Sequence, residues 1–259
     1  MIDNILPIPA FSDNYIWALT DRAQGVAAVV DPGDATPVID YLDREGLNLD
    51  AILITHHHPD HTAGLPELTS RYEPIVFGPH NPRIKDITQP MSEGDSLQML
   101  GVQFSVFEVP GHTLDHIAFF ARSEAPPVLF CGDTLFAAGC GRLFEGTPDM
   151  MYQSLCKLGS LPGQTRVYCT HEYTLANLRF AQAVDPDCEP LRARLNSDAQ
   201  LRLEGLPTLP STIALELKTN PFLRCSEPQL KAAAETHSGR TCGRSVDVFA
   251  AIRQWKDEF

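Results

Sequence analysis

The sequence predicts an α/β fold up to about residue 171, followed by a helical domain. Short apolar or alternating runs, which are typical of strands, recur throughout the first part. Thr-Pro pairs beginning at Thr36 and Thr147 combine an N-cap residue with proline at the first helical position, and they predict helices among the strands. After residue 172 the strand-like runs give way to longer helical patterns. We therefore predict two domains, residues 1–171 and residues 172–259.

The individual elements follow from the same patterns. Strands are predicted over residues 15–19, 26–30, 52–54, 75–77, 102–109, 117–120 and 128–130. A helix is expected from Thr36 to Gly46, and a second follows Thr147 and covers residues 150–158. Later helices are predicted at residues 173–184, 189–204, 226–236 and 245–257. Residues 206–212, which contain two prolines, are expected to form a connecting loop.

The composition predicts a cytoplasmic protein. The chain has 259 residues, of which 43% are hydrophobic and 20% charged, as in ordinary globular proteins. A formal net charge of -13 argues against nucleic acid or an anionic membrane as a partner. We see no signal-peptide pattern at the N-terminus and no apolar run of membrane-spanning length. The seven cysteines form no CxxC pair and are expected to be reduced; Cys140 stands out because it lies in a Gly-rich loop near other candidate residues.

The densest group of potential metal ligands lies directly after the apolar run at residues 51–54. His56, His58, Asp60 and His61 fall within six residues. In extended backbone the alternating His56 and His58 point to the same side. Asp60 and His61 lie further along the chain and can reach a neighbouring ion. The spacing therefore indicates two metal ions.

Three further potential ligands, His112, Asp133 and His171, each follow an apolar run. One such residue alone is usually a polar loop residue, but seven in this arrangement predict a dinuclear site. In the simplest division His56, His58 and His112 bind one ion, Asp60, His61 and His171 bind the other, and Asp133 bridges them. A bridging carboxylate is favoured because two neighbouring dications repel each other.

Other polar residues near these ligands allow more than one interpretation. His57, His80 and His237 are interpreted as ordinary surface or loop residues. His116 could orient a ligand or have a structural role, and Asp31 could orient a ligand histidine or simply form an Asp-Pro-Gly turn.

The HxHxDH motif with later His, Asp and His resembles the metallo-β-lactamase superfamily over residues 1 to about 172. A closer resemblance, to glyoxalase II or hydroxyacylglutathione hydrolase, covers essentially the full length. It is carried by Ala138-Gly139-Cys140-Gly141-Arg142, Thr170-His171-Glu172-Tyr173-Thr174, Asn220-Pro221-Phe222-Leu223-Arg224 and Arg253-Gln254-Trp255-Lys256-Asp257. The resemblance implies an αββα sandwich with a C-terminal helical domain that binds glutathione.

The same resemblance implies which residues contact the substrate: Arg142, Phe144, Tyr173, Arg253 and Lys256. Independently, Arg253 and Lys256 are three residues apart on a predicted helix, so they share a face that could bind glutathione carboxylates. A solvated basic face is the alternative. The chain departs from the family pattern at Arg142, where the family often has lysine, and at Phe144, where some members have tyrosine.

The resemblance also implies the chemistry. A metal-bound hydroxide would attack the thioester of S-D-lactoylglutathione, giving D-lactate and glutathione in methylglyoxal detoxification. Asp60 and Asp133 are the protein carboxylates expected to act in catalysis with that hydroxide. We expect two divalent metal ions per chain, zinc before iron or manganese. Imidazole and carboxylate ligands without thiolate suit all three metals. A monomer is expected.

Four other functions remain open at this point. A glutathione persulfide dioxygenase of the same fold would use a single iron, but the helical tail with Arg253 and Lys256 favours the thioesterase. A lactonase or β-lactamase-like hydrolase and an RNA-processing nuclease are further alternatives, and the net charge counts against the nuclease. A non-enzymatic metal-binding protein is disfavoured because a mixed His/Asp site usually leaves room for water.

Overall fold

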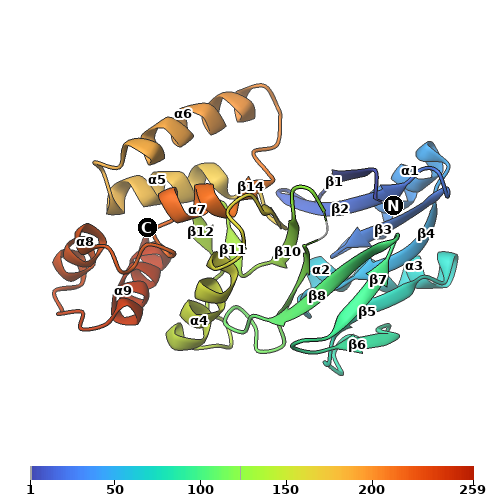
Figure 1. Ribbon diagram of the computed structural model, residues 1–259, viewed down its shortest axis with the longest axis horizontal. Coiled ribbons are helices and arrows are strands. Elements are labelled where there is room, and N and C mark those ends of the chain that lie inside the picture. Colours follow the sequence, from blue (N-terminus) through green and yellow to red (C-terminus); the bar gives the residue numbers. More distant parts are fainter. Residues whose placement is uncertain (1, 123) are drawn as a thin grey trace. The chain divides into compact units, whose positions relative to one another are not determined.

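The computed structural model describes residues 2–122 and 124–259, which fold into two compact units (Figure 1). Unit 1 comprises Met1–Glu108 and Asp115–Gly132, and unit 2 comprises Val109–Leu114 and Asp133–Phe259. These units divide the chain differently from the predicted domains 1–171 and 172–259, and that boundary stays a prediction. Among the described residues, no helix is both long and apolar enough to cross a membrane.

A six-stranded sheet of mixed direction forms one part of unit 1. Its strands, in spatial order, are β1 (Asn4–Ala10), β2 (Asn14–Asp21), β3 (Val26–Val30), β4 (Asn48–Leu53), β5 (Ile75–Pro79) and β6 (Gln89–Met91). The first two pairings are antiparallel and the rest are parallel. Parallel neighbours need a crossover. Helix α1 (Ala35–Glu45) connects β3 to β4, and α2 (Pro59–Thr62) and α3 (Leu65–Tyr72) connect β4 to β5.

Burial of apolar side chains holds α1 and α3 against this sheet. Ile16, Val29 and Ile52 from the strands form one buried cluster with Val38 of α1 and Leu68 of α3. Because burying an aliphatic side chain contributes about 1.5–3 kcal/mol, this cluster fixes the ends of β3 and β4, where polar side chains emerge.

Four antiparallel strands form a second part of unit 1, in the spatial order β10 (Val128–Gly132), β9 (Ile117–Ala121), β8 (Val102–Glu108) and β7 (Ser96–Met99). Every residue of β9 and β10 is buried, so both faces of these strands are covered. The Ile117 N–H donates to the Thr55 carbonyl over 2.9 Å, which joins the start of β9 to the segment after β4.

Unit 2 is mainly helical. Its helices are α4 (Pro148–Gly159), α5 (Thr174–Val184), α6 (Glu189–Leu203), α7 (Ile213–Thr219), α8 (Pro228–Ser238) and α9 (Ser245–Glu258). The strands β11 (Leu135–Phe136) and β12 (Gly139–Cys140) form a short hairpin, and β13 (Arg166–Cys169) pairs with β14 (Ser211–Thr212). Leu178 and Ala181 of α5 and Leu191 of α6 bury Ala138 of the hairpin turn.

The predicted class, α/β with a helical C-terminal region, is confirmed. Several details differ from the sequence predictions. Helix α1 is capped by Asp34, whose Oδ1 accepts from the Thr36 N–H over 2.9 Å, so the predicted cap at Thr36 is wrong, whereas Thr147 caps α4 as predicted. Strand β1 escaped prediction because Pro7 and Pro9 disfavour a strand, but it lies at a sheet edge, where prolines are tolerated. Helices α2, α3 and α7, strands β6 and β7 and the β11–β12 hairpin were not predicted, and strand β14 lies at the end of the predicted loop.

Candidate functional site

Unit 1 brings together the four ligands predicted from the HxHxDH motif. Strand β4 ends at Leu53, and α2 begins at Pro59, so His56 and His58 lie in the loop while Asp60 and His61 lie on the helix. The His56 Nε2 and His58 Nδ1 atoms are 3.1 Å apart, and the rings of His56 and His61 have centroids 4.1 Å apart. His56 and His61 are fully buried. The motif therefore folds into a compact cluster of imidazoles.

Asp31, at the end of β3, fixes the orientation of this cluster. Its Oδ1 accepts from the Thr55 N–H over 2.7 Å, and its Oδ2 accepts from the Thr55 hydroxyl over 2.7 Å and lies 2.9 Å from His61 Nδ1. The Thr55 hydroxyl is also 3.1 Å from His56 Nδ1. Because its proton is given to Asp31, this hydroxyl accepts from His56. The contacts favour the orienting role that the sequence left open for Asp31, and they add Thr55, which sequence reasoning missed.

Glycine allows α2 to approach the turn that carries Asp31. A Cβ atom on Gly33 would lie 1.9 Å from the backbone oxygen of Asp60. Any larger residue at position 33 would therefore push Asp60 and His61 away from Asp31.

Unit 2 brings together the other three predicted ligands. Asp133 follows β10 directly, and His171 follows β13 after one residue. The Asp133 Oδ2 atom is 3.4 Å from His112 Nε2 and 3.4 Å from His171 Nε2, so one carboxylate oxygen lies between two imidazoles. The His112 Nδ1–H donates to the Arg142 carbonyl over 2.9 Å. In the neutral ring this last bond fixes the tautomer of His112 and directs its Nε2 lone pair at Asp133.

These geometries fit divalent cations. With the rings neutral, His112 Nε2 and Asp133 Oδ2 are both acceptors, and so are His61 Nε2 and Asp60 Oδ2, which lie 3.5 Å apart. Such pairs repel unless a positive charge lies between them, and the distances exceed the ~2.7–2.9 Å of a charge-assisted hydrogen bond. Two ligands at about 2.0–2.1 Å from a tetrahedral ion are separated by about 3.3 Å. All seven predicted ligands belong to groups of histidine and aspartate that could hold a metal ion.

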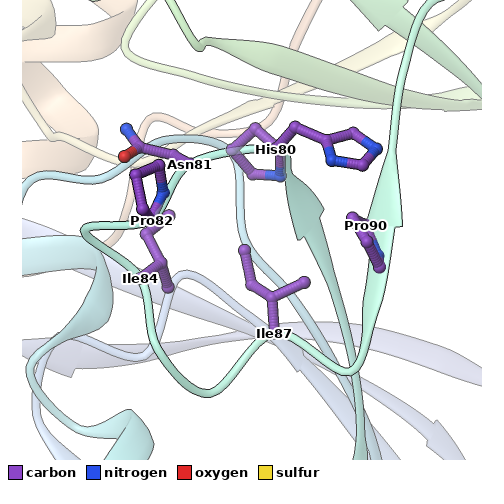
Figure 2. A pocket seen from close by; sticks show the side chains of 7 residues that line it. His80, Asn81, Pro82, Ile84, Ile87 and Pro90 are labelled. Atoms are coloured by element: carbon purple, nitrogen blue, oxygen red, sulfur yellow. The ribbon is translucent and has the colours of Figure 1, made fainter.

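His57, His80 and His116 of unit 1 were not predicted to bind metal. The ring of His116 stacks on that of His56 with centroids 4.6 Å apart, so it packs beside a ligand. Arg83 Nη1 donates to His57 Nε2 over 2.7 Å, which leaves the Nδ1–H of His57 to donate to Asp115 over 2.9 Å. His80 lies at a cavity of about 330 Å³ lined by Pro79, His80, Asn81, Pro82, Ile84, Ile87 and Pro90 (Figure 2). None of the predicted site residues lines that cavity.

Two of the predicted substrate contacts are aromatic rings that pack on predicted ligands in unit 2. The Tyr173 ring stacks on His171 with centroids 4.7 Å apart and an interplanar angle of 3°. Phe144 meets His112 edge-on at 5.2 Å and is 63% exposed. Phe136 contacts both Tyr173 and His171, a role that sequence reasoning missed. Tyr173 and Phe144 can therefore line a surface next to the predicted ligands His171 and His112.

The three predicted substrate-binding cations are held in different ways. Arg253 on α9 is buried, and its Nη1 donates to the Cys140 carbonyl over 3.1 Å. Its Nη2 is 3.0 Å from Asp257 Oδ1, and the same oxygen is 3.7 Å from Arg142 Nε. Lys256 is half-buried, with Nζ 4.9 Å from the centre of the Phe180 ring. Burial, followed by repulsion from Arg253, lowers the pKa of Lys256 to about 8.

The surroundings of Cys140 disfavour the thiolate form that a nucleophile would need. Its thiol is buried, and burial raises its pKa above the usual value of a thiol. Its carbonyl is instead a fixed acceptor for Arg253.

Comparison with known proteins places the chain in a superfamily and then in a family. The model of the metallo-beta-lactamase superfamily matches residues 14–186, and the model described as hydroxyacylglutathione hydrolase C-terminus matches residues 172–259. The BLEG-1 B3 metallo-beta-lactamase structure is similar with a TM-score of 0.64 and 25% identity, covering 85% of this chain and 99% of that chain. The fold is therefore that of the metallo-β-lactamase superfamily.

Full-length relatives define the family. The hydroxyacylglutathione hydrolase of Hahella chejuensis is 53% identical over 255 residues, covering 98% of this chain and 99% of the relative. That of Chromohalobacter salexigens is 52% identical over 259 residues, with coverage of 98% and 99%. The chain belongs to the hydroxyacylglutathione hydrolase family of enzymes, and the persulfide dioxygenase alternative is not favoured.

Proposed function

We propose that this chain hydrolyses the thioester of S-D-lactoylglutathione to D-lactate and glutathione, in methylglyoxal detoxification. The observation that carries the proposal is the 53% identity to a hydroxyacylglutathione hydrolase over nearly the whole chain. The family model described as hydroxyacylglutathione hydrolase C-terminus also covers α9 with Arg253 and Lys256. A shared fold alone would not support the activity, since one fold hosts many reactions.

The proposal includes two divalent ions per chain, with zinc before iron or manganese. His56, His58 and His112 would bind one ion, Asp60, His61 and His171 the other, and Asp133 both. Bound ions would supply Lewis acidity and a water of lowered pKa. The hydrogen bonds of Asp31 to His61 and of His112 to the Arg142 carbonyl support this assignment, because ligand histidines commonly use the second ring nitrogen in this way.

The protein's own groups would bind and orient the thioester. Arg142, Arg253 and Lys256 are cations that suit the carboxylates of the glutathione part. Tyr173 and Phe144 would line the acyl end beside His171 and His112. The carboxylates of Asp60 and Asp133 would supply negative charge at the metal site and orient the groups that react with the thioester. The leaving thiolate has a pKa of about 8.5, so it departs without a strong general acid.

Further parts of the proposal concern organisation. We assign catalysis to residues 1–171 and glutathione binding to residues 172–259, and we expect a cytoplasmic monomer with no nucleic-acid or membrane partner. The net charge of -13 supports the last point.

The test is hydrolysis of S-D-lactoylglutathione by the purified chain, with metal content measured on the same sample. We expect rapid hydrolysis with about two metals per chain, loss of activity on chelation, and recovery with zinc. Asp133→Asn should abolish turnover, whereas His237→Gln, a matched polar change at a residue that stacks on Trp255 and is not a predicted ligand, should not. A fully metal-loaded sample without hydrolysis would refute the proposal.

A further inference from the structure

One carboxylate joins two of the cations that the proposed function assigns to glutathione. Asp257 Oδ1 is 3.0 Å from Arg253 Nη2 and 3.7 Å from Arg142 Nε. The protein thus places a carboxylate of its own between two guanidinium groups that we assign to a carboxylate of the substrate. The Asp257 carboxylate and a substrate carboxylate cannot both accept hydrogen bonds from the same guanidinium N–H groups.

The contacts of Arg253 and Asp257 indicate that Asp257 is the member of the pair that can move. Arg253 is 5% exposed, and Asp257 takes no part in its bond to the Cys140 carbonyl or in its position 5.1 Å over the Phe222 ring. The Asp257 side chain is 44% exposed and lies in the last turn of α9. Because a half-exposed ion pair is weak, Asp257 can turn to solvent while Arg253 stays in place.

Charge gives a reason for an anion at this position. Arg142, Arg253 and Lys256 are close enough that both arginines lower the pKa of the lysine. Three neighbouring cations repel one another, so an anion there is stabilising. In the free protein Asp257 supplies it; in the complex the substrate would.

We propose that Asp257 is a resident competitor for the carboxylate subsite formed by Arg142 and Arg253, and that it lowers the affinity for glutathione thioesters and for glutathione itself. The inference rests on the proposed function, because it takes the substrate class from it. Its consequence is faster release of the product, which carries the same carboxylates as the substrate.

The test compares Asp257→Asn with a matched control, Glu258→Gln. Glu258 is exposed in the same turn and accepts a hydrogen bond from Gln254 over 3.1 Å, so the control removes one negative charge from the same helix end but leaves the subsite intact. Binding of glutathione is measured by calorimetry, and KM and kcat for the thioester are measured on the same samples. Asp257→Asn should lower Kd and KM by about 2- to 5-fold, as expected for loss of a weak competing ion pair, and Glu258→Gln should change them little.

A second ligand separates competition from general charge effects. Glutathione with its glycine carboxylate esterified should bind both proteins alike if that carboxylate displaces Asp257. A higher or unchanged Kd for glutathione in Asp257→Asn would overturn the inference, because it would mean that Asp257 orients Arg253. If glutathione binds as expected but no thioester is hydrolysed by metal-loaded protein, the proposed function fails and the competitor role stands.

Discussion

Lys256 should make the folded protein less stable at neutral pH than an apolar residue of the same length would. Burial and Arg253 lower its pKa from 10.5 to about 8. At about 1.36 kcal/mol per pKa unit, the displacement corresponds to at most about 3 kcal/mol at pH 7. Since the ammonium group is only half-buried, solvent screening reduces this to on the order of 1–2 kcal/mol. The contact between the Phe180 ring and the ammonium group stabilises the folded protein by about 0.5–1 kcal/mol, which offsets part of this cost.

Lys256→Met tests this reasoning because methionine is unbranched and only one atom shorter than lysine, and it removes the charge. We expect its free energy of unfolding at pH 7 to exceed that of the wild type by about 1 kcal/mol, while KM for the thioester rises. Between pH 8 and 10.5 the unfolded wild type binds more protons than the folded protein does, so wild-type stability rises with pH over this window. The difference between the two proteins should therefore shrink from pH 7 to pH 10.

The assay is urea unfolding at both pH values with metal content held constant. Lys231→Met serves as control, because Lys231 is exposed on α8 and lies 3.9 Å from Glu235, and it should show no such pH dependence. A variant that is less stable than the wild type at pH 7, or a difference that does not change with pH, would refute the reasoning.

Three more predictions concern single side chains. Asp31→Asn should weaken metal binding by about 10- to 100-fold in a competition titration, because it removes the charge that orients His61; unchanged affinity would make Asp31 a turn residue only. Glu216→Ala should lower the free energy of unfolding by about 3–5 kcal/mol, because it leaves Arg194, 2.8 Å away, buried and without this partner; a loss below 1 kcal/mol in urea titration would contradict this. Phe144→Tyr should lower KM up to about 5-fold, as one added hydrogen bond allows, and an unchanged KM would place residue 144 away from the substrate.

Short-range patterns could be predicted from the sequence, and long-range contacts could not. The cluster from His56 to His61 was predictable because its geometry follows from strand, loop and helix over six residues. The bonds from Asp31 to Thr55 and His61 join residues 24 and 30 positions apart, so spacing could not reveal them. The Arg253–Asp257 ion pair could have been predicted, because the two residues are four positions apart on a helix. The predictions made for that helix concerned only its cations.

Helix α7 shows why some elements stay hidden. It has seven residues, and its buried positions include Glu216, a charged residue that an apolar pattern would assign to the surface. Glu216 is tolerated there because Arg194 of α6 and the Ser211 hydroxyl satisfy its carboxylate. Such a pairing depends on α6 lying beside α7, which no local signal encodes.

The motif at Asn220-Pro221-Phe222 has a physical role that its sequence does not disclose. The Asn220 amide donates to the carbonyls of Phe136 and Gly139 over 3.2 and 2.9 Å, and the Glu216 carboxylate accepts from the Ala138 N–H over 2.8 Å. Ala138 has a φ of 54°, a left-handed conformation that needs such support in a residue other than glycine. Phe222, two residues further on, lies under Arg253. The same short segment thus holds the β11–β12 hairpin, which follows Asp133, and the arginine that we assign to substrate. Within unit 2, therefore, the C-terminal residues support the predicted metal ligand as well as the predicted glutathione contacts.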